Sequence, residues 1–80
     1  ELPGEDERKR LIMNVLGTFL APRFSWKLVL EQSCELSHSE IDHACKDAIK
    51  NAILAERHHV TATQLLVTIT ERKIIDRLWE

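Results

Sequence analysis

The chain has 80 residues and a formal net charge of −2, because 13 Asp and Glu stand against 11 Lys and Arg. This length corresponds to one small domain or to a piece of a larger protein, and a chain that begins with Glu1 and not with Met is expected to be a piece. The balanced charge argues against a protein built mainly to bind nucleic acid or an acidic membrane, while 2 glycines and 2 prolines leave no glycine-rich phosphate loop and too few turns for a β-barrel.

Residues 5 to 20 are predicted to form the first helix. The acidic residues 5–7 would lie in its first turn, where carboxylates suit the positive end of the helix dipole. Pro22 ends the helix, since it pushes the residue before it out of the helical conformation, and Gly17 is expected only to weaken the middle. Apolar residues recur at helical spacing: Leu11, Ile12, Val15, Leu16, Phe19 and Leu20.

Arg8, Lys9 and Arg10 form the main cluster of cations in this helix. We expect them on its solvated face, paired with Glu5 and Asp6 one turn away. The alternative is that they contact phosphates or a neighbouring subunit.

A second, shorter helix is predicted over residues 26 to 34. Ser25 is a suitable N-cap because its hydroxyl can accept a free backbone N–H, and Phe24 and Val29 have the spacing of a hydrophobic staple. The expected buried side of this helix consists of Trp26, Val29, Leu30 and Cys34.

The third helix has the clearest start signal. Ser37 and Glu40 have the spacing of a capping box, and Leu36 and Ile41 that of a staple. Asp42 and Lys46 are ordered for a favourable ion pair on the polar face, and the helix is expected to end before a linker at residues 58–60. Its predicted buried stripe consists of Ile41, Ala44, Cys45, Ala48, Ile49, Ala52 and Ile53.

A second capping box, Thr61 with Gln64, predicts the start of the fourth helix, with Val60 and Leu65 as its staple. The apolar stripe then loses its phase, so the last ten residues are expected to face another direction or to form a separate turn. Their apolar members are Ile74, Ile75, Leu78 and Trp79. These residues either fold back and complete the core or dock on another subunit, as exposed apolar clusters commonly do.

The predicted fold is therefore all-α, a small four-helix domain over residues 1–73. Residues 74–80 form a C-terminal apolar extension or the end of the last helix. No segment alternates for long enough to be a strand.

In its order of elements, this chain resembles the C-terminal helical lid of AAA+ ATPases. Residues 36–41 are similar to the turn and cap that many members write as Gly-Phe-Ser-Gly-Ala-Asp-Ile, and residues 60–66 to an Ile-Thr-x-Glu-Asp-Leu helix start. Residues 44–48 resemble the small, apolar helix that follows the cap. At the beginning of the chain the resemblance is carried by Leu2-Pro3, Arg8 and Leu11-Ile12.

The resemblance implies a domain that closes over ATP and packs on a neighbouring subunit. The family's ATPase core, which carries the catalytic motifs, would precede it in the same chain. We therefore expect ATP with Mg²⁺ in the parent protein, no tightly bound cofactor on this piece, no catalytic residue within it, and a homo-oligomer. Whether this piece should itself be called an enzyme is left open.

Mapped onto this chain, the family's nucleotide contacts fall in two places. The start of the third helix supplies Ser37, His38 and Ser39, and the first helix supplies Leu11, Ile12 and Val15. His38 and Ser39 stand where many members have Gly-Ala, so His38 either obstructs the base or stacks on it.

Two other classes of function stay open. One is a stand-alone helical module that binds a partner helix in a groove. The other is a helix-turn-helix nucleic-acid binder, which Asp42 and Asp47 disfavour because they would repel phosphates.

Four side chains, Cys34, His38, His43 and Cys45, lack the spacing of a zinc site, so we expect structural or solvated roles for them. No apolar run approaches the roughly 18 residues of a membrane span, and 2 cysteines fit a reducing compartment. A cytoplasmic protein without membrane contact is expected.

Overall fold

The fold is built from four α-helices and one short 3-10 turn, which confirms the predicted all-α class. The computed structural model describes residues 2–78, with side chains through residue 75. Between residues 2 and 78 the only β-type pairing is a single parallel bridge that joins Leu20 to Val60. The elements are α1 (Glu5–Leu16), η1 (Gly17–Phe19), α2 (Trp26–Gln32), α3 (His38–Leu54) and α4 (Ala62–Leu78).

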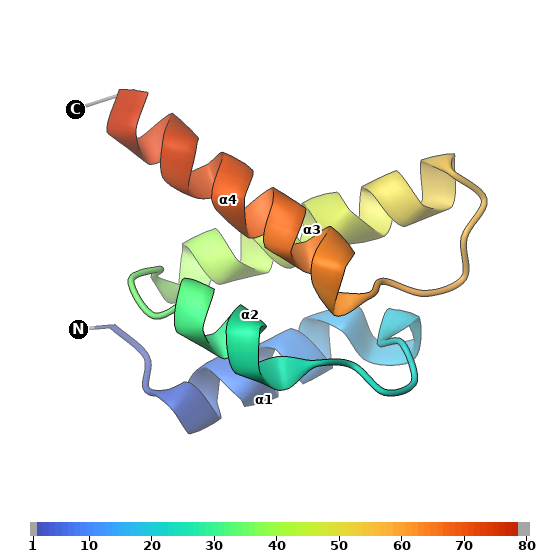
Figure 1. The fold of residues 1–80 in the computed structure, drawn as a ribbon, viewed down its shortest axis with the longest axis horizontal. Coiled ribbons are helices and arrows are strands. Elements are labelled where there is room, and N and C mark those ends of the chain that lie inside the picture. The colour runs from blue at the N-terminus through green and yellow to red at the C-terminus, as the bar shows by residue number, and fades with distance from the viewer. Residues whose placement is uncertain (1, 79–80) are drawn as a thin grey trace.

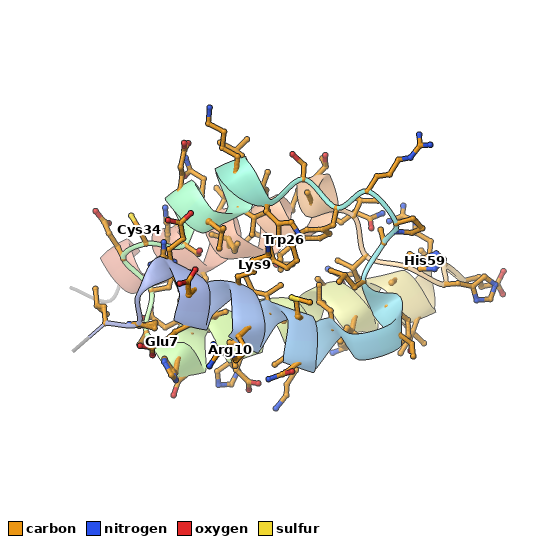
Figure 2. The ribbon with its side chains drawn as sticks, turned by 90° about the horizontal axis from the view of Figure 1, so that it is seen from below. Glu7, Lys9, Arg10, Trp26, Cys34 and His59 are labelled. Carbon is orange, nitrogen blue, oxygen red and sulfur yellow. The ribbon has the colours of Figure 1, made fainter. Side chains whose placement is uncertain are left out.

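α3 is the central helix of the domain. It packs against α1 on one side and α4 on the other, while α2 contacts α4 and α1. Figure 1 shows α4 crossing α3, with α1 and α2 below them. Both ends of the chain lie at one end of the domain, and the α3–α4 loop, which contains His59, lies at the other (Figures 1 and 2).

One apolar core joins the helices. Both members of the staples Leu36–Ile41 and Val60–Leu65 are buried in it, as the sequence predicts. Phe24 and Trp26 are half-buried at its edge, with ring centroids 4.6 Å apart. The core consists of Ile12, Leu16, Val29, Leu36, Ile41, Ala44, Cys45, Ala48, Ala52, Val60, Leu65 and Ile69.

Two of the three predicted caps form as expected. The Ser37 hydroxyl accepts the Glu40 N–H at 3.3 Å, and the Ser37 N–H donates to the Glu40 carboxylate at 3.0 Å. Thr61 and Gln64 exchange the equivalent bonds at 3.3 and 2.9 Å. Ser25 occupies the N-cap position of α2, but its side chain makes no capping bond, so that prediction is wrong in its chemistry.

The first three helices end earlier than predicted. Gly17 adopts φ 51°, the left-handed conformation that glycine tolerates best, and its N–H caps α1 by donating to the Met13 carbonyl. The predicted helix over residues 5–20 therefore stops at Leu16. At the end of α3, Glu56 also has a positive φ, of 58°, and the helix ends at Leu54.

Two residues predicted to be buried are exposed. Cys34 lies beyond the end of α2, and Ser33 is buried in its place, with its hydroxyl bonded to the Leu30 carbonyl at 3.3 Å. Ile53 is 59% exposed in the last turn of α3. Both predictions assumed that the helical period continues to the end of the segment, whereas the core extends only as far as the neighbouring helices cover it.

The fourth helix continues unbroken to Leu78, so the alternative of a separate turn is wrong. Thr68 anchors the helix, because its buried hydroxyl lies 2.9 Å from the carbonyl oxygens of both Ala44 and Leu65. Past this anchor, the side chain of Lys73 donates to the Gln32 side chain at 3.3 Å. Ile74 and Ile75 extend beyond the core.

The basic run divides into three environments. Arg8 is 8% exposed and donates to the Pro3 carbonyl at 2.9 Å and to the Leu30 carbonyl at 3.0 Å. The Lys9 ammonium lies 5.3 Å from the centre of the Trp26 ring, a cation–π distance, and Arg10 is exposed (Figure 2). The prediction of a solvated Arg8 is therefore wrong, because its guanidinium satisfies backbone carbonyls inside the domain.

Candidate functional site

The capping box fixes where α3 begins relative to α1. Ser37, the N-cap of α3, is half-buried. The two residues that follow it, His38 and Ser39, are exposed. The first N–H groups of a helix have no partner within the helix, so this turn offers donors to a ligand. All three residues were predicted to contact a nucleotide, and the structure places them at one corner of the domain.

The face of α1 that approaches this corner is mostly polar. Glu7, Arg10, Leu11 and Asn14 share one side of the helix, since they are spaced three, four and seven residues from Glu7. Together with His38 they line a hollow of about 240 Å³, which we call the α1–α3 hollow. Figure 2 shows Glu7 and Arg10 on a different side of α1 from Lys9, which points to Trp26.

Glu7 and His38 bridge the two helices at the rim of the α1–α3 hollow. The Glu7 carboxylate lies 3.5 Å from Nε2 of His38, and both side chains are 62% exposed. An ion pair with this exposure is worth about 1 kcal/mol or less, because water competes for both groups. The interaction between Glu7 and His38 is therefore weak enough for a ligand to displace it.

The predicted contacts of the first helix fall at two depths. Leu11 and Val15 are half-buried against the core, and Leu11 also lines the α1–α3 hollow. Ile12 is fully buried at 0% exposure. The structure thus brings Leu11 and His38 together in one hollow, while Ile12 lies in the core.

Two lining residues, Glu7 and Asn14, were not singled out from the sequence as ligand contacts, and Arg10 was named only within the alternative that the basic run contacts phosphates. Their spacing with Leu11 was visible as a helical stripe. The missing information was tertiary, because only the packing of α1 on α3 decides which stripe meets His38.

The predicted interaction residues lie at the end of α4. Ile74 is 52% exposed and Ile75 is 42% exposed, so neither completes the core. Leu78 is the last residue of α4, with its side chain outside the described part, and Trp79 lies outside the described residues. Val67, two turns before Ile74, is 54% exposed and adds to the apolar surface of α4.

A larger hollow, of about 680 Å³, lies where the α3–α4 loop meets η1. It is formed by the ends of these segments and not by a pair of packed helix faces. No residue predicted to bind a nucleotide lines it. Its lining consists of Thr18, Phe19, Ile53, Glu56, Arg57, His58 and His59.

The two cysteines differ in environment. Cys34 is exposed, whereas Cys45 is buried in the core, where desolvation, with a further contribution from the Asp42 carboxylate, raises the pKa of its thiol from 9.0 to about 12. Within the described part of the chain, no three His, Cys, Asp or Glu side chains are grouped so that they could hold a metal ion.

The raised pKa of Cys45 predicts a loss of stability at high pH. Folding keeps this thiol protonated, so its stabilising contribution is complete below pH 9 and is lost as pH rises from 9 toward about 12. In that range each further pH unit should lower the free energy of unfolding by about 1.4 kcal/mol through this thiol.

Urea unfolding at pH 8 and at pH 10.5 measures this change. Between the two pH values, Cys45→Ala should lose less free energy of unfolding than the wild type. An equal loss in both would contradict the assignment, and exposed Cys34→Ala is the control that should retain the wild-type loss.

The comparisons with known proteins do not point to a function for this chain. Among the described residues, no helix has the length and apolar character needed to cross a membrane. The candidate site is the α1–α3 hollow, with the exposed start of α3 beside it. No protein-family model matches this chain, and no curated protein matches it.

Proposed function

We propose that this chain is the helical lid of an AAA+ ATPase, which closes over ATP held on a separate hydrolysing core. One observation carries the proposal. Leu11 and His38, which the resemblance assigns to nucleotide contact from two different helices, line the same α1–α3 hollow. Leu11 gives the hollow an apolar surface, and its other lining residues, Glu7, Arg10, Asn14 and His38, supply polar groups around it.

The lid acts mechanically. ATP bound between core and lid contacts both only when they are closed, so it selects the closed arrangement. Mg²⁺ accompanies the phosphates and belongs to the core. The four helices share one core and move as a unit, and the buried bond from Arg8 to Pro3 makes the N-terminal segment move with them.

The exposed end of α4 supplies the second contact of this proposal. The end of α4, which carries the exposed Ile74 and Ile75, lies at the same end of the domain as the N-terminal segment (Figure 1). In a cytoplasmic homo-oligomer they contact a neighbouring subunit, which passes the lid's movement around the assembly. Apolar surface of this kind is typical of interaction sites.

A stand-alone interaction module is the second candidate. It is favoured by Val67 and Ile74, two exposed apolar residues seven positions apart on α4, a spacing that suits a partner helix. The two functions differ in one property, since only the lid requires nucleotide.

The proposal is tested by placing negative charge at the start of α3 in the full-length protein that contains this chain. In the double variant His38→Glu and Ser39→Glu, the new carboxylates suit the first turn of a helix, so the fold is retained. The carboxylate at position 38 lies next to Glu7, and both new carboxylates repel an anionic nucleotide, so ATP affinity should fall at least about tenfold, or about 1.4 kcal/mol. Isothermal titration calorimetry measures it.

His43→Glu is the matched control. His43 is exposed on the same helix and does not line the α1–α3 hollow, so this variant should bind ATP like the wild type. Unchanged ATP affinity in the double variant would remove the start of α3 from the nucleotide site.

A further inference from the structure

Asn14 is placed in the α1–α3 hollow without a hydrogen-bond partner of its own in the described chain. It is exposed and lies one turn beyond Leu11 on the same face of α1. A side chain in this position can meet the edge of a planar group that rests on Leu11. Its amide carries both a donor, the NH₂ group, and an acceptor, the carbonyl oxygen.

The other polar groups of the hollow are less suited to that edge. Glu7 and His38 already face each other at 3.5 Å. Arg10 has only donors, and its charge suits a phosphate or a carboxylate. Asn14 is therefore the lining residue whose side chain carries a donor and an acceptor side by side, with neither engaged by the described chain, whereas Nε2 of His38 faces Glu7.

The edge of adenine that presents N6 and N7 matches this pair of groups. N6 is a donor and N7 an acceptor, and asparagine pairs with both in a bidentate arrangement. Guanine presents two acceptors, O6 and N7, on the same edge, so the Asn14 carbonyl would face O6 without a proton between them. The match is specific to adenine.

We propose that Asn14 reads the N6–N7 edge of the adenine base and so makes the lid selective for adenine nucleotides. The inference rests on the proposed lid function and adds to it a residue that determines base specificity.

The test is a double-mutant-type cycle, in which the affinities of the wild type and of an Asn14 variant are each measured for ATP and for an analogue that lacks N7. In the full-length protein, Asn14→Ala should weaken ATP binding about ten- to a hundredfold, the range of one bidentate pair. 7-Deaza-ATP lacks the N7 acceptor, so the wild type should bind it more weakly than ATP, while the variant should bind the two alike. The variant should also lose most of the preference for ATP over GTP. Alanine favours a helix, so the fold is retained.

Asn51→Ala controls for the loss of an exposed asparagine, since Asn51 lies on α3 outside the α1–α3 hollow. It should bind all three nucleotides as the wild type does. If Asn14→Ala binds ATP normally, or weakens ATP and 7-deaza-ATP by the same factor, the base-reading role is overturned and the lid function stands. If the wild-type protein binds none of the three nucleotides, both proposals are overturned.

Discussion

Replacing Arg8 with methionine is expected to lower the free energy of unfolding by about 2–4 kcal/mol, a large part of the stability of a small domain. The guanidinium is 8% exposed and makes two charge-assisted bonds, to the carbonyls of Pro3 and Leu30. Methionine fills much of the volume but leaves both carbonyls without this donor. Urea unfolding followed by circular dichroism measures the change.

Two further variants separate geometry from charge. Arg8→Lys keeps the charge but replaces a planar fork of donors with a single ammonium, so it should recover only part of the stability. Arg10→Met removes an exposed cation from the same helix and should cost less than about 0.5 kcal/mol. Equal effects of Arg8→Met and Arg10→Met would contradict the buried role of Arg8.

The second large effect is expected from Ile41→Ala, which should destabilise the domain by about 2–5 kcal/mol. Ile41 is 1% exposed, and it packs with Leu36 where α3 meets the core, so the substitution leaves a cavity. Ile53→Ala makes the same chemical change on the same helix at 59% exposure and should cost less than about 1 kcal/mol. Unfolding midpoints of the two variants test the burial pattern of α3. Similar losses would show that Ile53 is buried in solution.

The starts of the helices could be predicted because local chemistry decides them. The capping boxes of α3 and α4 require two side chains three residues apart, and both form. The ends were harder, since they depend on left-handed residues. Gly17 gave a weak signal, and Glu56, a residue that rarely adopts this conformation, gave none.

Burial could be predicted only where another helix covers the stripe. Periodicity placed Ile41 and Ile53 on one face of α3, but the end of α3 extends beyond its neighbours and Ile53 is exposed. Arg8 was predicted to be exposed but is buried, because a neighbouring helix covers it. Sequence rules treat an arginine in an acidic first turn as solvated, whereas the fold brings the Leu30 carbonyl, 22 residues away, to its guanidinium.

The candidate site was predicted in part. The resemblance named Leu11 and His38, which line the α1–α3 hollow, but it also named Ile12, which is buried. Neither it nor the residue pattern named Asn14. A family pattern identifies positions that its members share, and the polar residues that a single chain adds around them become visible only when the helices are packed.

Hydrogen–deuterium exchange of the full-length protein, with and without ATP, tests the lid function most directly. A lid that closes over the base should slow amide exchange at residues 38–41 and 8–15, which flank the α1–α3 hollow, and leave residues 55–61 at the opposite end unchanged. If the protein binds ATP while exchange at 38–41 and 8–15 stays the same, the nucleotide lies elsewhere and this domain is not its lid.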